Sequence, residues 1–133
     1  MSTHLHDGRD WFLERRFGMF IHWGIYAIPG WHEQHQWRGR VPWDEYITLR
    51  NQWNPVRFDP DAWLDLAEEA GMQYLVFTTK HHDGFCLWDT AQTDYNTMNT
   101  PYGRDILGQL ADACHRRHVP LGLYYSIADW HQR

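Results

Sequence analysis

The sequence predicts an α/β fold built on a parallel sheet, and three observations support this class. Three short apolar segments are typical of strands, two amphipathic segments are typical of helices, and strands and helices alternate along the chain. Strands that alternate with helices form βαβ units with right-handed crossovers, so the sheet is parallel. A doubly wound sheet and a barrel both fit this order. Because no glycine-rich phosphate loop follows a strand, a nucleotide-binding sheet is disfavoured.

The first expected strand lies in the apolar run 17–28 and ends near His22 and Trp23. A loop is expected over 29–41, where glycines and polar residues cluster. A short helix is expected over 42–52, because its apolar residues share one face.

The next helix is expected to begin at Asp59, a good N-cap, with Pro60 at the first helical position. Gly71 is typical of a helix end. The apolar stripe of this helix follows the spacing i, i+3, i+4 and i+7 and comprises Trp63, Leu66, Ala67 and Ala70. The run 74–79 that follows is nearly all apolar and β-branched, as expected of a strand covered on both faces.

A further helix is expected from Asp105, with a basic last turn over 115–118 that suits the negative end of the helix dipole. Its apolar stripe comprises Leu107, Leu110, Ala111 and Cys114. The run 121–127 completes the pattern as a third strand.

The length of 133 residues is the usual size of one domain, so residues 1–133 are expected to form a single domain. The net charge of −5 argues against a nucleic-acid partner, and no run of 18 apolar residues predicts a membrane span. The polar N-terminal stretch resembles no signal peptide. Two cysteines, Cys86 and Cys114, are too few for a disulfide framework, so a cytoplasmic location is expected.

The unusual feature of the composition is an aromatic content of 17%, with nine tryptophans. Flat apolar rings with a polar edge suit a sugar-binding cleft. The alternative is that the tryptophans serve as bulky packing.

Polar and aromatic side chains gather directly after each expected strand. Because the carboxyl ends of parallel strands form the functional edge of α/β folds, these clusters predict a site there. The clusters are His22, Trp23 and the segment 31–37, then His81, His82, Asp83 and Trp88, and last Asp129, Trp130 and His131.

Five stretches resemble the α-L-fucosidases of glycoside hydrolase family 29. They follow the order of that family and span nearly the whole chain, and TTKHHDGF is the most specific motif among them. The stretches are FGMFIHWG (17–24), FDPDAWLDLAEEAGMQYLVFTTKHHDGFCLWD (58–89), TDYN (93–96), GRDILGQL (103–110) and LGLYYSIADWH (121–131).

The resemblance implies a partial (β/α)8 barrel with about three parallel strands and covering helices, and a retaining mechanism. It also implies substrate-binding roles for several side chains. His22 corresponds to a histidine that hydrogen-bonds fucose hydroxyls, and His81 and His82 correspond to a pair of which at least one faces the sugar. A neutral imidazole both donates and accepts, so it can read a pattern of hydroxyls.

Three further substrate-binding residues follow from the same resemblance. Trp37 stands where the family often has a Trp beside a substrate-contacting Glu, although Gln36 precedes it in this sequence. Tyr125 and Trp130 match a family segment near the pocket.

No catalytic residue is assigned. Retaining hydrolysis uses two carboxyl groups about 5–5.5 Å apart. The resemblance implies an Asp nucleophile after a fourth strand and a general acid further on, and neither has a counterpart in this sequence. The carboxylates that follow the strands, Glu33, Asp83, Asp89 and Asp129, match no catalytic position of the family. Asp83 is expected to cap a loop or to orient His82.

Three functions fit the sequence. The chain is a fragment of an α-L-fucosidase, with weak or no activity alone, or a catalytically incomplete module that binds L-fucose or a fucosylated glycan, or a purely structural remnant. Three strands leave open sheet edges, whereas a complete barrel typically needs about 250 residues. We therefore expect completion by self-association into a homo-oligomer or by a complementing C-terminal half.

No cofactor and no functional metal are expected. Metal-dependent hydrolases of this fold class often place two histidines two residues apart after the first strand, and the segment 22–24, His-Trp-Gly, lacks that pattern. His32 with His35, or His4 with His6, could hold a divalent ion only adventitiously.

Overall fold

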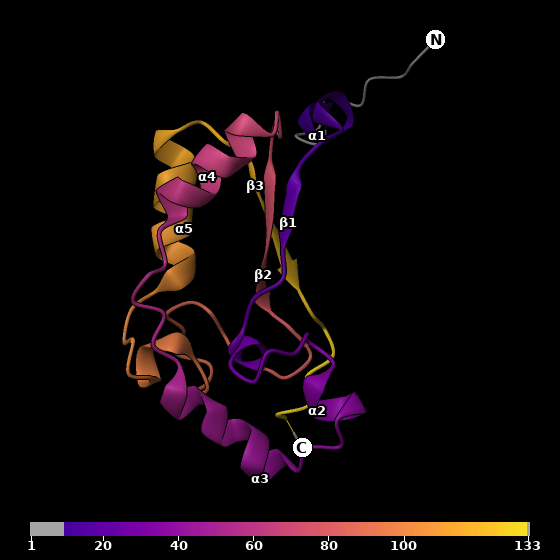
Figure 1. The fold of residues 1–133 in the computed structure, drawn as a ribbon, viewed down its shortest axis with the longest axis vertical. Coiled ribbons are helices and arrows are strands. Elements are labelled where there is room, and N and C mark those ends of the chain that lie inside the picture. The colour runs from indigo at the N-terminus through magenta and orange to yellow at the C-terminus, as the bar shows by residue number, and fades with distance from the viewer. Residues whose placement is uncertain (1–9, 133) are drawn as a thin grey trace.

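The computed structural model describes residues 10–132, in which three parallel strands form an open sheet in the order β1–β2–β3 (Figure 1). Strand β1 is Met19–Ile21, β2 is Leu75–Lys80 and β3 is Leu121–Tyr125. Strand β2 lies in the middle and pairs in parallel with both neighbours. The predicted class, an α/β fold with a parallel sheet, is confirmed.

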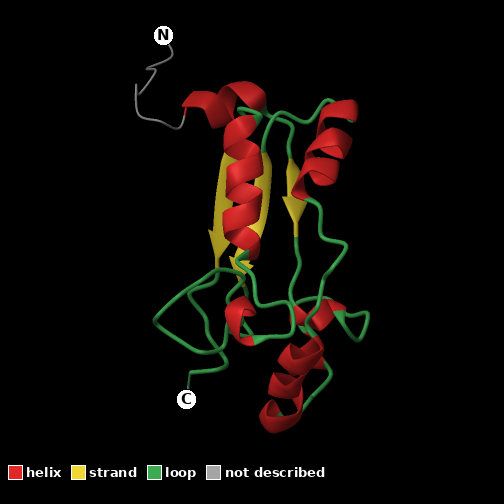
Figure 2. Ribbon diagram, turned by 90° about the vertical axis from the view of Figure 1, so that its left-hand side faces the viewer, coloured by secondary structure: helices red, strands yellow, loops and turns green. Residues whose placement is uncertain are grey.

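Helices α4 (Pro60–Glu69) and α5 (Ile106–Arg116) lie on the same face of this sheet (Figures 1 and 2). Both begin at the predicted caps. The Asp59 carboxylate accepts a backbone N–H of the first turn at 3.0 Å, and the Asp105 carboxylate accepts one at 2.7 Å. Each such cap stabilises its helix by about 1 kcal/mol.

The buried face of each helix is turned relative to the predicted stripe. Leu66 of α4 is 58% exposed, whereas the neighbouring Leu64 is buried. In α5, Ile106 and Ala113 are buried, whereas Leu107 is only half-buried. The two helices contact each other as well as the sheet. The spacing of apolar residues predicts one buried face for each helix, and it does not predict the second contact between the helices.

The main hydrophobic core lies between the sheet and the two helices. Leu75 and Phe77 of β2 are fully buried there, together with Leu64 and Leu110 of the helices. The prediction that β2 is covered on both faces is confirmed for five of its six residues, and only Val76 is half-buried. The face opposite the helices is open beside Val76, where Phe20 of β1 is 51% exposed.

Short helical segments lie in the connections, and four of them, α1, α2, η1 and η3, were not predicted. Helix α1 (Asp10–Arg15) precedes β1, and α2 (His35–Arg38) lies inside the segment predicted as a loop. The helix predicted over 42–52 is present as α3 (Trp43–Tyr46) continued by the 3-10 helix η2 (Ile47–Gln52). Two further 3-10 turns are η1 (Ile25–Ala27) and η3 (Thr97–Asn99). Figure 1 shows α2 and α3 at the end of the sheet where the strands finish, beside the C-terminal residues.

No helix of the described residues is both long enough and apolar enough to cross a bilayer. The two cysteines, Cys86 and Cys114, are buried and form no disulfide. Burial raises the pKa of the Cys86 thiol to about 12 and also raises that of Cys114, so both thiols stay protonated and unreactive.

Candidate functional site at the carboxyl edge of the sheet

The segments that follow the three strands are tied together by hydrogen bonds. The backbone N–H of Trp23, after β1, donates to the Thr78 hydroxyl of β2 at 3.1 Å. The backbone N–H of Ser126, after β3, donates to the carbonyl of Lys80 at 3.0 Å, and that of Trp130 donates to the carbonyl of His82 at 2.7 Å. The predicted clusters therefore meet at one edge, where all three arrowheads point in Figure 2.

Three histidines and one tyrosine form a cluster at this edge, called here the histidine group: His22, His81, His82 and Tyr124. The ring of His81 lies 5.6 Å from that of His22 and 4.3 Å from that of His82. Tyr124 stacks on His81 at 5.1 Å and lies 6.0 Å from His22. Successive side chains of a strand point to opposite faces. His81 and His82 can lie side by side because β2 ends at Lys80 and a turn begins there.

His81 is held as a neutral imidazole with its proton on Nε2. Burial, with a smaller contribution from His82, lowers the pKa of His81 to about 4. Its Nδ1 accepts the backbone N–H of His82 at 2.9 Å, so the proton of the neutral ring resides on Nε2. His81 therefore offers a hydrogen-bond donor at Nε2.

His82 is oriented in the opposite tautomer. Its Nδ1 lies 2.6 Å from the Ser126 hydroxyl, and that hydroxyl donates its own proton to the carbonyl of Ala128 at 2.9 Å. Nδ1 of His82 must therefore donate to Ser126, which leaves Nε2 as the acceptor of the neutral ring. The neighbouring histidines thus offer one donor and one acceptor to a bound hydroxyl group.

Glu33 adds a negative charge beside these rings. Partial burial raises the pKa of Glu33, but a hydrogen bond from its own backbone N–H and the nearby imidazoles of His81, His32 and His22 more than offset this, so its pKa is lowered. The carboxylate is therefore ionised and accepts hydrogen bonds. The family resemblance implies a glutamate at position 36, where this sequence has Gln36. The carboxylate near the histidines comes instead from Glu33, three residues earlier.

The remaining predicted site residues lie in different places. Trp130 contacts the ring of His82 at 5.1 Å, so it borders the histidine group. Trp37 lies 6.1 Å from Trp130 and is 71% exposed, one step further from the histidines. Tyr125 does not join the group, because it lies beside Trp88 at 6.2 Å and over the ammonium of Lys80. Successive side chains of β3 point to opposite faces, so Tyr124, and not Tyr125, lies beside His81.

Two of the carboxylates that follow the strands, Asp83 and Asp129, have structural partners. Asp83 accepts the Tyr46 hydroxyl at 2.8 Å and the backbone N–H of Phe85 at 3.2 Å, so it caps a loop, which is one of its two expected roles. Burial raises the pKa of Asp83 to about 6. Asp129 forms an ion pair with the buried Lys80 at 3.0 Å. The role of orienting His82 falls to Ser126 rather than to Asp83.

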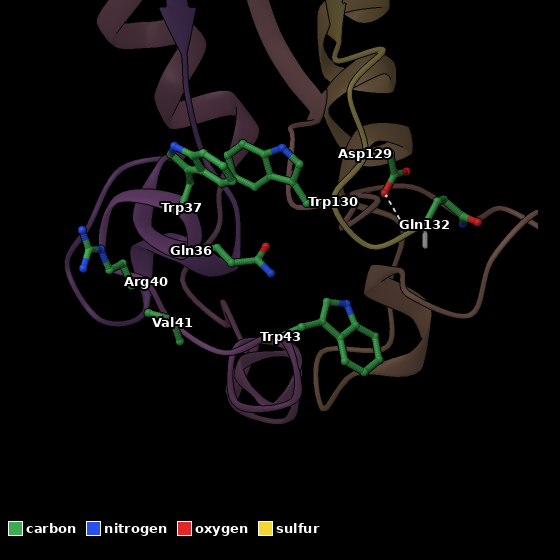
Figure 3. Close-up of a pocket in the computed structure, with 8 residues that line it drawn as sticks. All are labelled: Gln36, Trp37, Arg40, Val41, Trp43, Asp129, Trp130 and Gln132. Carbon is green, nitrogen blue, oxygen red and sulfur yellow. Dashed lines mark hydrogen bonds between the residues drawn. The ribbon is translucent and has the colours of Figure 1, made fainter.

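A pocket of about 750 Å³ lies next to the histidine group (Figure 3). It is bounded by the segment before and at the start of α3 and by the segment after β3. Trp37 and Trp130 lie side by side along one wall, Trp43 forms the opposite wall, and the amide of Gln36 extends between them (Figure 3). The lining residues are Gln36, Trp37, Arg40, Val41, Trp43, Asp129, Trp130 and Gln132.

Among the described residues, no three His, Cys, Asp or Glu side chains gather closely enough to hold a metal ion. The Nδ1 atom of His32 accepts the backbone N–H of Gln34 at 3.2 Å, and the ring of His35 stacks on Trp31. The pair His4 and His6 lies outside the described residues.

The fold and the site define the class of protein. Parallel strands end in a cluster of oriented imidazoles, one ionised carboxylate and exposed tryptophan rings. This combination defines an α/β protein with an open parallel sheet whose candidate site lies at the carboxyl edge of the strands.

Comparison with known proteins gives the family. The model of the alpha-L-fucosidase family matches residues 2–133, so the chain belongs to this family. The tissue alpha-L-fucosidase of Macaca fascicularis is 34% identical over 138 residues, which cover 91% of this chain and 30% of that protein. The chain thus spans about a third of the length of such relatives.

Two solved structures are similar in sequence and fold. Alpha-L-fucosidase isoenzyme 1 from Paenibacillus thiaminolyticus is 52% identical, with a TM-score of 0.90, and the match covers 93% of this chain and 30% of that one. An alpha-L-fucosidase from Bacteroides thetaiotaomicron, trapped as a covalent intermediate in complex with 2-fluoro-fucosyl fluoride, is 45% identical with a TM-score of 0.85. That match covers 90% of this chain and 30% of the other.

Proposed function

We propose that this chain binds the L-fucosyl group of α-L-fucosides at the carboxyl edge of its sheet, as part of a retaining α-L-fucosidase. The observation that carries the proposal is the histidine group, in which His81 offers a donor and His82 an acceptor, and the ring of His81 lies 5.6 Å from that of His22. The similar enzyme from Bacteroides thetaiotaomicron was trapped as a covalent intermediate with a fucosyl compound, which supports both the ligand and the retaining mechanism.

The chemistry of L-fucose matches this site. The sugar has neighbouring ring hydroxyls and one methyl group. The hydroxyls suit the Nε2 donor of His81, the Nε2 acceptor of His82 and the carboxylate of Glu33. The methyl group suits the apolar ring of Phe20, which lies 4.4 Å from that of His22.

We assign the binding step, and not the cleavage step, to the residues described. Asp83 is buried and bonded to Tyr46, and Asp129 is paired with Lys80, so neither carboxyl group is positioned to attack or protonate a substrate. Glu33 has a lowered pKa, which suits an acceptor rather than a general acid. We place the two catalytic carboxyl groups in the remaining two thirds of a full-length enzyme of this family.

The test is calorimetry with L-fucose, with D-fucose, its mirror image, as the control ligand. We expect L-fucose to bind and D-fucose not to bind, and His81→Ala to weaken binding of L-fucose roughly 2- to 10-fold, the usual effect of one lost hydrogen bond. His115→Ala, an exposed histidine on α5, should leave the affinity unchanged. No heat with L-fucose at millimolar concentration overturns the proposal.

A chromogenic aryl α-L-fucoside tests the division between binding and cleavage. We expect no turnover by this chain. Turnover by this chain alone would show that the cleaving carboxyl groups lie within it, and would overturn the assignment.

A second function, assembly with another polypeptide, is favoured by the exposed apolar side chains on the last strand and beyond. Leu123 is 59% exposed and Ile127 is 95% exposed, and β3 has an unpaired edge in the sheet described. We propose that this edge is covered either by a second copy of the chain or by a complementing C-terminal half of the barrel.

A further inference from the structure

We propose that two consecutive threonines of β2, Thr78 and Thr79, are positioning residues of the site at the carboxyl edge of the sheet. Neither belongs to the histidine group, and neither is assigned a contact with the ligand. Their hydroxyl groups hold the segments that carry His22 and Tyr124 against the central strand. The inference rests on the proposed function, because it takes the histidine group as the place where the L-fucosyl group binds.

The backbone pairing of β1 with β2 stops just before His22. The last pair in register is Ile21 with Phe77, and β1 itself ends at Ile21. The hydrogen bonds of a parallel ladder fix the position of one strand on the next. Beyond Ile21 the ladder no longer does this, so the place of His22 depends on other contacts.

The side chain of Thr78 supplies such a contact. Its hydroxyl oxygen accepts the backbone N–H of Trp23 at 3.1 Å, and the hydroxyl donates its own proton to the carbonyl of the same residue at 3.3 Å. One side chain, only 1% exposed, thus serves both backbone groups of Trp23. Because His22 directly precedes Trp23, this double contact holds the His22 backbone beside β2.

The residue after His22 is anchored, whereas His22 itself is exposed. The indole of Trp23 packs on Trp53 at 4.8 Å, and Thr78 binds its backbone. The ring of His22 lies 5.6 Å from His81 across the edge of the sheet. An exposed ring is held at such a distance by its backbone, so the anchor at Trp23 sets the spacing of the two imidazoles.

The pairing of β2 with β3 is irregular at Thr79. Thr78 pairs with Tyr124 and Lys80 pairs with Tyr125, so two steps along β2 match one step along β3. Thr79 is the extra residue in this register shift. Such an extra residue disrupts the ladder locally, and shifts of this kind are common next to functional sites, where they redirect a side chain.

The hydroxyl of Thr79 bridges this irregular step. It donates to the carbonyl of Tyr124 at 3.0 Å, and the side chain is buried. The ring of Tyr124 in turn stacks on His81 at 5.1 Å with an interplanar angle of 25°. Thr78 and Thr79 therefore each add a side-chain hydrogen bond where the backbone ladder ends or shifts, one toward His22 and one toward Tyr124.

The test is calorimetry with L-fucose on the 133-residue chain. Thr78→Val and Thr79→Val keep a branched side chain and remove the hydroxyl. We expect each variant to bind L-fucose roughly 2- to 10-fold more weakly, the usual effect of one lost hydrogen bond. Thr78→Ser keeps the hydroxyl and should restore the wild-type affinity.

Thr97→Val is the matched control. Thr97 is also buried, and its hydroxyl donates to the carbonyl of Arg104 at 3.1 Å in the segment around η3. This variant should lose stability in urea unfolding as the other two do, yet keep its affinity for L-fucose. If Thr78→Val and Thr79→Val also lose stability but keep their affinity, the threonines are merely structural, and the inference is overturned while the fucose site stands.

A measurement on the ligand-free chain separates this inference from the proposed function. In NMR we expect the cross-peak between the ring protons of His22 and His81 to weaken in Thr78→Val, and that between His81 and Tyr124 to weaken in Thr79→Val. Unchanged cross-peaks in both variants would overturn the inference whether or not L-fucose binds. If the cross-peaks weaken but the wild-type chain does not bind L-fucose, the positioning roles stand and the proposed function falls.

A second substitution covers the case in which Thr78→Val does not fold. Thr78→Cys is close to threonine in size, and its thiol is a weak donor and a weak acceptor. We expect this variant to weaken the cross-peak between His22 and His81 and to lower the affinity, each less than a complete loss of the hydroxyl. A cysteine variant that matches the wild-type chain in both readouts would contradict the role of Thr78.

Discussion

At the residue scale, the central feature is that two adjacent histidines are fixed in opposite tautomers. Ser126 fixes that of His82, because its hydroxyl proton is used on the carbonyl of Ala128. The backbone N–H of His82 fixes that of His81. A ligand with neighbouring hydroxyls meets a ready donor and acceptor, and no proton has to be rearranged when it binds.

Ser126→Ala tests this orientation. We expect the affinity for L-fucose to fall by roughly 2- to 10-fold, because His82 loses the partner that orients its ring. A purely structural role for Ser126 would leave the tautomer of His82 unchanged. We expect instead that the side-chain nitrogen signals of His82 in ¹⁵N NMR shift toward a mixture of tautomers. Thr48→Ala, which removes an exposed hydroxyl that donates to the carbonyl of Glu45, should change neither readout.

The pH dependence of stability has two opposing parts. The pKa of His81 is lowered to about 4 in the folded chain, so this residue adds stability that is complete above about pH 6.5 and is lost as pH falls to about 4. The pKa of Asp83 is raised to about 6, so this residue subtracts stability as pH rises from about 3.8 to 6. Each effect is on the order of 3 kcal/mol.

Two variants separate these parts in urea unfolding between pH 4 and 7. Asp83→Asn should make the loss of stability on acidification steeper than in the wild-type chain. His81→Gln should make it shallower, or reverse it. Parallel pH profiles for the two variants would show that neither group titrates as described.

The residues of the site were predictable in part. The histidines could be located because they follow a buried strand in a recognisable motif, whereas their tautomers depend on Ser126, 44 residues further along the chain. The sequence predicts a binding role for Tyr125, whereas the structure places Tyr124 beside the histidines, because the register of β3 decides which of two consecutive tyrosines lies there. The sequence places Glu33 only among the carboxylates that follow the strands. Its position near the histidines was not predictable, because it depends on the fold of the segment before α2.

At the scale of elements, the site depends on how the segments after β2 and β3 are held together. Gly84 lies where these two segments pack together and has a φ of +81°. A Cβ atom there would lie 2.5 Å from Oδ1 of Asp129 and 2.7 Å from Cβ of His131. Because Asp129 also pairs with Lys80, a displacement at this point would disturb the ion pair and the pocket wall together.

Gly84→Ala tests this contact, and Gly71→Ala is its matched control. Gly71 has a similar φ of +73°, but a Cβ atom added there would meet no other described atom within 4 Å. Both substitutions therefore carry the same backbone strain, and only Gly84→Ala adds a clash. We expect Gly84→Ala to lower the free energy of unfolding by about 1–3 kcal/mol more than Gly71→Ala, measured by urea denaturation. Equal losses would show that the two segments are not tightly packed at this point.

The strands and the two long helices were predicted from periodicity and caps, and their order and parallel pairing are confirmed. The short helices α1 and α2 were not predicted, because segments of 6 and 4 residues carry too few turns for a periodic signal. The shift of the buried face from Leu66 to Leu64 in α4 arises because α4 also packs on α5, a contact that no local pattern contains.

At the scale of the whole molecule, the open sheet predicts association. Ile127→Lys and Leu123→Lys place charges on the exposed side of β3 and beyond, where both residues are more than half exposed. If copies of the chain cover this edge, light scattering should show an oligomer for the wild-type chain and a monomer for the double variant. Val56→Lys, at an exposed apolar residue in a loop before α4, should leave the oligomer intact. A stable wild-type monomer in dilute solution would contradict self-association.

The most direct test of the central claim is a titration of the ¹⁵N-labelled chain with L-fucose, followed through the side-chain nitrogen signals of its histidines. The account predicts that the signals of His22, His81 and His82 move together with one dissociation constant, and that D-fucose leaves them unchanged. Signals that stay fixed at saturating L-fucose, or that move only for histidines far from this edge such as His115, would contradict it.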